Sequence, residues 1–363
     1  TQFAPAVGTK DAQYLPMVIT KEAIDSFRGR MLKELKTFYP GPVKQTTELM
    51  HTATSHRSMD GVSLYVDVKE QLLKLADCRF VATIVGSGTV ANEVMFGMVK
   101  SVFPKQQGLI VSNGEFGERL IYQAKHWELT FVQKSYDWGA AFNLVEIEAM
   151  FIENDIRCLA FVHGETSTVT CNPLHNLIQL CQKYNVKLCV DCISSFGTHP
   201  FSLKDVFCAT AVSGKAIGAL GGLSFVFYND EPAEIEGIPS YVNLDTYHNY
   251  MPFTVPAFLL ANTLAALEQY PARFEVLQQR LQLMLDSSIY LQYGLQTAHY
   301  PIIVTFVGVN DFYTCTRLND FDLHGASAYL KQRDYVQLSV IQPTFEKDFA
   351  ALERLFTNYM KLT

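Results

Sequence analysis

One lysine of the chain stands where an apolar run gives way to a glycine-rich loop. The segment reads Cys208-Ala-Thr-Ala-Val-Ser-Gly-Lys-Ala-Ile-Gly-Ala-Leu-Gly-Gly222, with the lysine at position 215. Burial and neighbouring positive charge lower the pKa of a lysine amine, which favours nucleophilic use of the amine. A solvated lysine after a strand is the alternative. The position of Lys215 therefore predicts a reactive amine, provided that other functional groups converge on it.

A carboxylate lies inside the preceding apolar run, Val186-Lys-Leu-Cys-Val-Asp-Cys-Ile-Ser-Ser-Phe-Gly197. A buried carboxylate needs a partner, and Asp191 has three candidates: the pyridine nitrogen of pyridoxal phosphate, a metal ion or a helix N-terminus. Two cysteines of this run, Cys189 and Cys192, are three positions apart and point to opposite faces of an extended strand. We therefore expect them to be core thiols, and we expect no metal site.

A third element is Gly86-Ser-Gly-Thr89, which separates an apolar strand pattern from a helical pattern. Backbone N–H groups at such a turn, the helix dipole and the hydroxyls of Ser87 and Thr89 suit a phosphate group. An ordinary strand-to-helix turn looks similar, and the segment matches neither the P-loop nor the full dinucleotide motif. A nucleotide-binding or NAD-binding protein is the alternative, but it leaves Lys215 and Asp191 unexplained.

Phosphate loop, buried carboxylate and lysine, in this order, resemble a fold-type I, class V pyridoxal-phosphate aminotransferase. Within that class the chain is most similar to the 2-aminoethylphosphonate:pyruvate transaminases, and the resemblance covers about residues 40 to 255, whereas the last third matches poorly. The matching segments are Pro40-Gly-Pro-Val43, Ser55-His-Arg-Ser58, Gly86-Ser-Gly-Thr89, Asn113-Gly-Glu-Phe-Gly-Glu-Arg119, Val162-His-Gly-Glu-Thr-Ser-Thr168, Asn172-Pro-Leu174, Val190-Asp-Cys-Ile-Ser-Ser-Phe-Gly197, Ser213-Gly-Lys215 and Pro252-Phe-Thr254.

The resemblance implies a role for each matched position. Lys215 would be the Schiff-base lysine of pyridoxal phosphate, and Asp191 would be the partner of the pyridine nitrogen. The remaining implied cofactor contacts are Ser87, Gly88 and Thr89 to the phosphate, Phe116 on the ring face, Thr166 or Thr168 near the phenolic oxygen, Ser213 beside the lysine, and Thr254 to the cofactor of the neighbouring subunit of a homodimer. The alternatives are a plain core position for Phe116, strand surface for the threonines, and a helix N-cap for Thr254.

The sequence departs from the resembled family where substrate would bind. A C-terminal strand of that family carries an arginine for the anionic group of the substrate, and guanidinium suits this bidentate task. The corresponding strand here, Asp334 to Pro343, has Gln337 in that place. Arg333 and Arg57 are candidate replacements, although a helix-surface or ion-pair role is the alternative for them. Further departures are Val169 in place of glycine and Gly214 in place of asparagine.

These residues predict an enzyme that transfers an amino group from a primary amine or amino acid, of the 2-aminoethylphosphonate kind, to a 2-oxo acid. The alternative keeps the cofactor but ends in elimination, replacement or carbon–carbon bond formation on a larger amino acid such as S-adenosylmethionine. A non-catalytic binding descendant of the family is a third possibility.

The apolar runs alternate with amphipathic stretches, which is typical of an α/β protein. The expected strands are residues 79–85, 108–112, 129–133, 157–163, 187–191, 208–213 and 222–228, in a mostly parallel seven-stranded sheet flanked by helices. We expect an N-terminal arm and helix over 1–42, with the helix at 21–37, and a large cofactor domain over 43–255. A long bridging helix, at about 256–288, and a smaller α+β C-terminal domain would occupy 256–363.

Composition excludes some function classes. The net charge of −7 over 363 residues offers no basic surface for nucleic acid. The sequence has no apolar run of about 18 residues, and its first residues lack a signal-peptide pattern, so we expect neither membrane insertion nor export. Most of the eight cysteines lie in apolar segments, as reduced core residues of a cytoplasmic protein do.

Overall fold

A seven-stranded sheet forms the centre of the molecule in the computed structural model, which describes residues 35–43, 55–232, 237–295 and 300–361. Its strands coincide with the expected apolar runs to within two residues, because each run is long enough for a buried strand and too short for a buried helix. The strands are β2 (Phe80–Val85), β3 (Gly108–Ser112), β4 (Phe131–Ser135), β5 (Cys158–Val162), β8 (Lys187–Asp191), β9 (Cys208–Val212) and β10 (Leu223–Tyr228).

The strand order in this sheet is β2-β10-β9-β8-β5-β3-β4. Strand β10 runs against its neighbours, β2 and β9, and the other pairs are parallel. The expectation of a mostly parallel seven-stranded α/β sheet is thus confirmed. Parallel strands present their carboxyl ends at one edge, where ligands bind in open α/β sheets.

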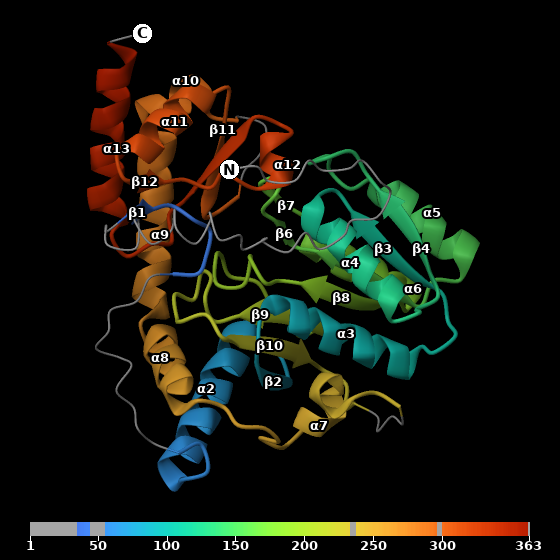
Figure 1. Ribbon diagram of the computed structural model, residues 1–363. Helices are drawn as coiled ribbons and strands as arrows, with labels where there is room; N and C mark the ends of the chain where they lie inside the picture. Colours follow the sequence, from blue (N-terminus) through green and yellow to red (C-terminus); the bar gives the residue numbers. More distant parts are fainter. Residues whose placement is uncertain (1–34, 44–54, 233–236, 296–299, 362–363) are drawn as a thin grey trace, which may run out of the picture.

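Helices cover both faces of the sheet (Figure 1). On one face the core contains residues of α3 (Gly88–Val102), α4 (Glu115–His126) and α7 (Leu244–Tyr247), and the short η2 (Ser240–Val242) packs beside α3. On the other face it contains residues of α2 (Met59–Ala76), α5 (Leu144–Asn154), α6 (Leu174–Tyr184) and α8 (Ala257–Glu268). Cys189 belongs to the first core and Cys192 to the second, and neither forms a disulfide, which confirms them as core thiols.

The described residues of the C-terminal region, 270–361, contribute most of another hydrophobic core, which also contains Phe38, Val43, Val169 and Ala216. The two-stranded sheet of β11 (Ile303–Val307) and β13 (Tyr335–Ser339) is antiparallel, while β1 (Lys36–Thr37) pairs in parallel with β12 (Phe321–Asp322). The helices of this region are α9 (Tyr270–Leu285), α10 (Ser288–Tyr293), α11 (Asn310–Leu318), α12 (Ala328–Lys331) and α13 (Phe345–Met360). The domain boundaries expected from the sequence stay a prediction.

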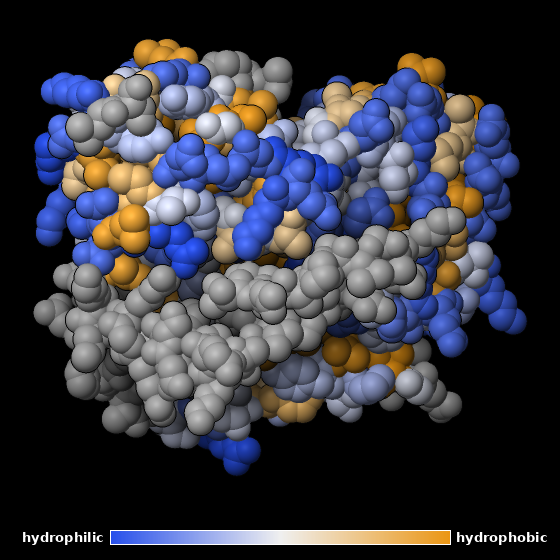
Figure 2. All heavy atoms as spheres, turned by 45° about the horizontal axis from the view of Figure 1, so that its top comes forward, coloured by the Kyte–Doolittle hydropathy of each residue, from blue (hydrophilic) through white to orange (hydrophobic). Residues whose placement is uncertain are grey.

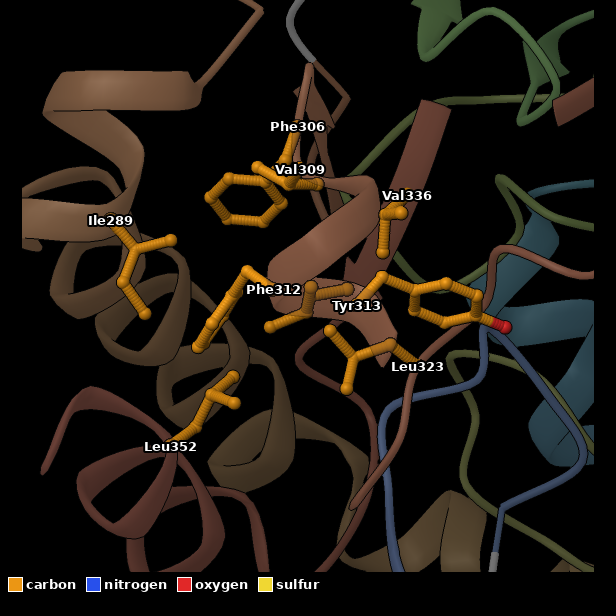
Figure 3. Close-up of a pocket in the computed structure, with 9 residues that line it drawn as sticks. Ile289, Phe306, Val309, Phe312, Tyr313, Leu323, Val336 and Leu352 are labelled. Atoms are coloured by element: carbon orange, nitrogen blue, oxygen red, sulfur yellow. The ribbon is translucent and has the colours of Figure 1, made fainter. Parts of the chain in front are cut away.

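Apolar side chains from several elements meet inside the C-terminal region (Figure 3). Phe312 lies beside Ile289 of α10 and Leu352 of α13, Phe306 lies next to Val309, and the hydroxyl of Tyr313 points away from them. The hollow between these side chains measures about 10 Å³, which is at most the space of one water molecule. We conclude that it is a packing gap of the core.

Two expectations about helices were wrong. The expected long helix from 256 to 288 is broken at Gln269, and α9 starts anew with Pro271 in its first turn. Proline lacks the N–H that would continue the ladder, and its ring clashes with the preceding turn. The expected N-terminal helix does not extend to Thr37, because Lys36 and Thr37 form β1; its residues 21–34 lie outside the described residues.

Exposed apolar side chains lie as separate patches among hydrophilic residues on the face drawn in Figure 2. Single exposed apolar residues of this kind are normal for a protein surface. Among the described helices, none combines the length and the hydropathy that crossing a membrane requires.

Candidate functional site

A cavity of about 170 Å³ opens at the carboxyl ends of the central strands. Val162 and Asp191 end β5 and β8, and Lys215 follows β9. Five of the predicted site residues line the cavity: Gly88, Thr89, Phe116, Asp191 and Lys215. Its other lining residues are Asn92, Arg119, Val162, Gly164, Ile193 and Ser194.

The carboxylate of Asp191 is buried and held from two sides. The Nδ2 of Asn92 donates to its Oδ2 over 2.8 Å, and the backbone N–H of Ile193 donates to its Oδ1 over 2.9 Å. The amide of Asn92 is itself oriented, because its Oδ1 accepts a hydrogen bond of 2.8 Å from Thr210. Burial raises the pKa of Asp191, and the two hydrogen bonds oppose this shift. The result is a fixed acceptor for a protonated ring nitrogen.

Lys215 lies in a tight loop between β9 and β10. The Ser213 hydroxyl lies 2.5 Å from the carbonyl oxygen of Leu220 and 3.1 Å from that of Leu223. This hydroxyl therefore closes the loop, and the cofactor contact that the resemblance implies for Ser213 stays a prediction. Burial lowers the pKa of the Lys215 amine to about 8, with Arg119 adding to the shift and Asp191 opposing it. An amine with this pKa both accepts and releases a proton near neutral pH.

Gly214 and Gly41 allow this loop to pack closely. A Cβ on Gly214 would lie 2.8 Å from the Cα of Gly221, so this fold has no space there for the asparagine of the resembled family. A Cβ on Gly41 would lie 3.0 Å from the Cδ of Lys215 and 3.1 Å from the carbonyl oxygen of Gly214. Gly41 also has a φ of +147°, which side-chain-bearing residues rarely adopt.

The Gly41→Ala change is expected to lower activity beyond its effect on stability. The new methyl group would push on Lys215, and we expect a loss of about tenfold or more in kcat/KM. Gly308→Ala is the matched control, because Gly308 also has a positive φ (+70°), whereas a Cβ added there would meet no atom within 4 Å. Strain costs each variant about 1–3 kcal/mol in the free energy of unfolding. Equal kinetics of the two folded variants would contradict the contact with Lys215.

The N-terminus of α3 forms one wall of the cavity. Ser87 is the N-cap, and its side chain makes no capping hydrogen bond. The first N–H groups of a helix have no acceptor within the helix, and the helix dipole favours an anion there. Gly88 and Thr89 of this first turn line the cavity. This wall offers backbone donors and a hydroxyl to a phosphate group.

Phe116 is positioned by a fully buried glutamate. Glu165 accepts the backbone N–H groups of Phe116 and Gly117 through Oε2, each over 3.0 Å. Its Oε1 accepts the backbone N–H of Ser167 over 3.1 Å. Burial raises the pKa of Glu165 to about 7. The glutamate thus ties the first turn of α4, with its aromatic ring, to the hairpin after β5.

The hairpin of β6 (Gly164–Glu165) and β7 (Thr170–Cys171) contains the two predicted threonines. Both are buried, and neither is among the residues that line the cavity. The Thr168 hydroxyl lies 3.0 Å from the Thr170 hydroxyl. Val169 has a φ of +56°, which is an outlier for a β-branched residue. This conformation gives a physical reason for the glycine that the resembled family has there.

The candidate substrate residues lie apart from the cavity lining. Gln337 is buried in β13, and its Nε2 donates to the carbonyl oxygen of Thr166 over 2.7 Å. The guanidinium of Arg333 lies over the Trp138 ring, with Cζ 3.5 Å from the centroid. Arg57 is exposed in the turn before α2, and Thr254 is exposed before α8.

Sequence reasoning missed three residues at the site: Asn92, Arg119 and Gly41. Asn92 had a usable signal, since it is a polar residue within the apolar helix Thr89 to Val99, and a buried polar residue has a partner. Arg119 lay in a matched segment but received no role. Gly41 also lay in a matched segment, Pro40-Gly-Pro-Val43, but received no role, because its contact with Lys215 depends on the tertiary fold.

The donor set of the cavity fits pyridoxal phosphate. A buried carboxylate suits a pyridinium nitrogen, an amine with a lowered pKa suits the aldehyde, and a helix N-terminus suits the phosphate. The face of Phe116 adds an apolar platform for the ring. These groups line one cavity, and they derive from α3, α4, β8 and the loop after β9.

The family model and the most similar curated relatives both agree with the family that the motifs resemble. A family model described as aminotransferase class-V matches residues 32–235, which is more than half of the chain. A 2-aminoethylphosphonate–pyruvate transaminase of Lysinibacillus sphaericus is 27% identical, over 91% of this chain and 98% of its own length. One of Pseudomonas entomophila is 30% identical, over 75% of this chain and 81% of its own length.

Solved structures share the fold. Alanine–glyoxylate aminotransferase from Nostoc sp. superposes with a TM-score of 0.79 and 20% identity, over 90% of this chain and 96% of that one. Pyridoxamine–pyruvate aminotransferase from Mesorhizobium loti superposes with a TM-score of 0.77 and 16% identity, over 90% and 93% of the two chains.

Proposed function

Since the chain belongs to the class-V aminotransferase family and therefore transfers amino groups with pyridoxal phosphate, we propose that its donor is a primary amine or amino acid without a dianionic end group. The acceptor would be a 2-oxo acid. The observation that carries the donor class is the buried amide of Gln337, which is committed to the protein backbone at the place where the resembled enzymes have a guanidinium.

The cavity supports a distribution of roles among its residues. Lys215 would hold the cofactor covalently, Asp191 would hold its ring nitrogen, and Ser87, Gly88 and Thr89 would hold its phosphate. When bound, the cofactor supplies an electron sink for bond cleavage at the donor carbon. The Asn92 amide keeps Asp191 in place, and the Phe116 ring would shield one face of the cofactor ring from water.

Lys215 is also the group that would move the proton. When it is not bonded to the cofactor, Nζ of Lys215 would accept a proton from the donor carbon and return it elsewhere. Burial, which lowers the pKa of this amine to about 8, keeps a useful fraction unprotonated near neutral pH. The buried Asp191 nearby opposes that shift, so the amine still binds the proton well enough to carry it.

Gln337 disfavours a donor with a dianionic end group. The Gln337 atom that faces the Thr166 carbonyl oxygen has to be the amide nitrogen, because only the nitrogen donates. The other polar atom of the side chain is therefore the carbonyl oxygen, Oε1. Within the described part of the chain, Oε1 has no hydrogen-bond partner. A carbonyl oxygen accepts hydrogen bonds and cannot neutralise a phosphonate. A donor with an uncharged or hydrogen-bond-donating end is therefore favoured.

Steady-state kinetics with 2-aminoethylphosphonate and pyruvate test this donor class. We expect weak or absent turnover, with a kcat/KM below about 10⁴ M⁻¹s⁻¹, because the amide of Gln337 does not compensate the phosphonate charge. A parallel series uses uncharged primary amines as donors with pyruvate, and alanine as donor with a 2-oxo acid other than pyruvate. Efficient turnover of the phosphonate would contradict our proposal for Gln337.

The same series separates amino transfer from the other outcomes of this cofactor. Amino transfer converts pyruvate to alanine in an amount equal to the donor consumed. Elimination, replacement or carbon–carbon bond formation would consume a donor such as S-adenosylmethionine without forming alanine. No observation on the described residues favours these outcomes over amino transfer.

We also propose that the active unit is a homodimer, with Thr254 near the cofactor of the partner subunit. Thr254 is exposed within its own chain, and the segment before α8 matches the resembled family. Thr254→Ala is expected to weaken cofactor binding by about tenfold or more, since a hydrogen bond to a charged group contributes about 1.5–3 kcal/mol. Thr314→Ala, at another exposed threonine, is the control. The proposal would be refuted if sedimentation showed that the protein becomes a monomer on dilution while an assay at the same concentrations showed full activity.

A reducing compartment such as the cytoplasm is the location that the cysteines support. All eight are free thiols, and disulfides are rare in reducing compartments.

A further inference from the structure

Three metal-ligating side chains converge beside the β6–β7 hairpin. His163, Cys171 and His199 offer ligand atoms that all lie within 4.8 Å of one another. His163 follows β5, Cys171 ends β7, and His199 lies in the turn after β8. None of them belongs to the lining of the cavity that holds Lys215 and Asp191. The cluster is therefore a separate feature of the fold.

The backbone fixes two of the three positions. The N–H of His163 donates to the carbonyl oxygen of Asp191 over 2.9 Å, and the N–H of Asn172 donates to the carbonyl oxygen of His163 over 2.8 Å. These bonds hold His163 against the end of β8 and hold Cys171 beside it. The cluster is thus built on the rigid end of the central sheet.

The distance between two of the ligand atoms matches tetrahedral coordination. Cys171 Sγ lies 3.5 Å from His163 Nε2. A tetrahedral zinc ion, with bonds of about 2.3 Å to sulfur and about 2.0–2.1 Å to nitrogen, separates such a pair by about 3.6 Å. A hydrogen bond between thiol and imidazole has a similar length, so the distance alone does not decide between the two.

The hydrogen bonds of His199 leave its Nε2 available to bind a metal ion. The Thr198 hydroxyl donates to the Ser195 carbonyl oxygen over 2.8 Å, so toward His199 Nδ1, at 2.8 Å, it acts as an acceptor. His199 therefore carries its proton on Nδ1 and a lone pair on Nε2. A metal-ligating histidine typically donates its other N–H in this way.

Burial of the two imidazole rings favours their neutral form, which is the form that binds a metal ion. Burial lowers the pKa of His163 to about 3, and burial also lowers the pKa of His199. The Cys171 thiol has a pKa raised to about 11 by burial.

We propose that His163, Cys171 and His199 bind a divalent cation of the zinc class, with a water molecule as the fourth ligand. Two nitrogens and one sulfur favour zinc over magnesium or calcium, which prefer oxygen ligands. On binding, the S–H bond of Cys171 breaks, a metal–sulfur bond forms, and the proton leaves to solvent without any redox change. Cys171 and His199 are only half-buried, which gives the ion a route in. The proposal is independent of the donor class proposed above.

Zinc stoichiometry of the holoenzyme tests the site. The protein is equilibrated with zinc chloride, separated from free ions and assayed for metal by mass spectrometry. We expect one zinc ion per chain that Cys171→Ser and His199→Gln abolish, with an affinity loss of more than about 100-fold in each, since even outer contacts of a metal site carry 10–100-fold. Cys315→Ser, at another half-buried thiol, and His126→Gln are the matched controls and should retain the ion.

Cobalt supplies a readout that a surface-bound ion does not give. A difference spectrum of the wild-type holoenzyme, with and without cobalt chloride, should show thiolate-to-cobalt charge transfer that is absent in Cys171→Ser. Circular dichroism establishes that this variant is folded; if it is not, the wild-type difference spectrum decides alone. Absence of zinc from the wild type, unchanged zinc in Cys171→Ser, or a cobalt spectrum without charge transfer would each overturn the proposal and leave a thiol–imidazole hydrogen bond.

Discussion

Replacement of Lys215 by alanine is expected to abolish amino transfer. In the proposed mechanism the change removes both the covalent anchor of the cofactor and the base that moves the proton, and general acid–base catalysis alone contributes about 10²–10⁴-fold. We therefore expect kcat to fall by at least about 10³-fold. The fold should survive, because the loop around position 215 is closed by Ser213 and its backbone contacts.

Lys204→Ala is the matched control, since Lys204 is an exposed lysine outside the cavity. It should retain wild-type kcat with the same donor and acceptor. A primary amine added to the medium should restore part of the activity of Lys215→Ala, because a soluble base replaces Nζ. Appreciable unaided turnover by Lys215→Ala would remove this residue from the chemistry.

Asp191→Asn is expected to have the second largest effect. Asparagine keeps the size of the side chain but not its negative charge, so the ring nitrogen of the cofactor would lose its proton. We expect kcat to fall by about 100-fold or more, because the electron sink then fails. One of the hydrogen bonds from Asn92 and Ile193 would lose its acceptor, and a buried donor without a partner costs about 1–3 kcal/mol in the free energy of unfolding, so the protein should stay folded.

The exposed Asp205 provides the comparison for this variant, because Asp205→Asn removes the same charge away from the cavity. Thermal unfolding monitored by circular dichroism should give similar midpoints for the two variants. Kinetics then separate them, and unchanged turnover in Asp191→Asn would remove Asp191 from the site.

The sheet was predictable from the sequence because most of its strands are apolar runs of five or six residues. Helix breaks were harder to predict. The apolar pattern continues across Gln269, and the break there depends on Pro271, whose effect a periodicity argument overlooks. The strand at Lys36 and Thr37 exists only because β12, far away in the sequence, pairs with it. Such non-local pairing leaves no mark in a local pattern.

The site was predictable where a residue would cost the fold free energy unless it had a functional partner. A lysine before glycines, a carboxylate inside a strand and glycines before a helix all predicted positions that the structure brings to one cavity. Ser213 shows the limit of this reasoning. The sequence places Ser213 beside Lys215, but it does not give the direction of the hydroxyl, which closes the loop. The sequence indicates that Gln337 replaces an arginine, whereas only the tertiary fold shows its hydrogen bond to the Thr166 carbonyl oxygen.

Peptide mapping after borohydride treatment tests the central claim most directly. Purified holoenzyme should absorb visible light, and borohydride should fix the cofactor to the protein by reducing its bond to the lysine amine. Digestion and mass spectrometry should then find the label on the peptide that contains Ser213-Gly-Lys215. A label on another lysine, or a protein that retains no label, would contradict the assignment of Lys215.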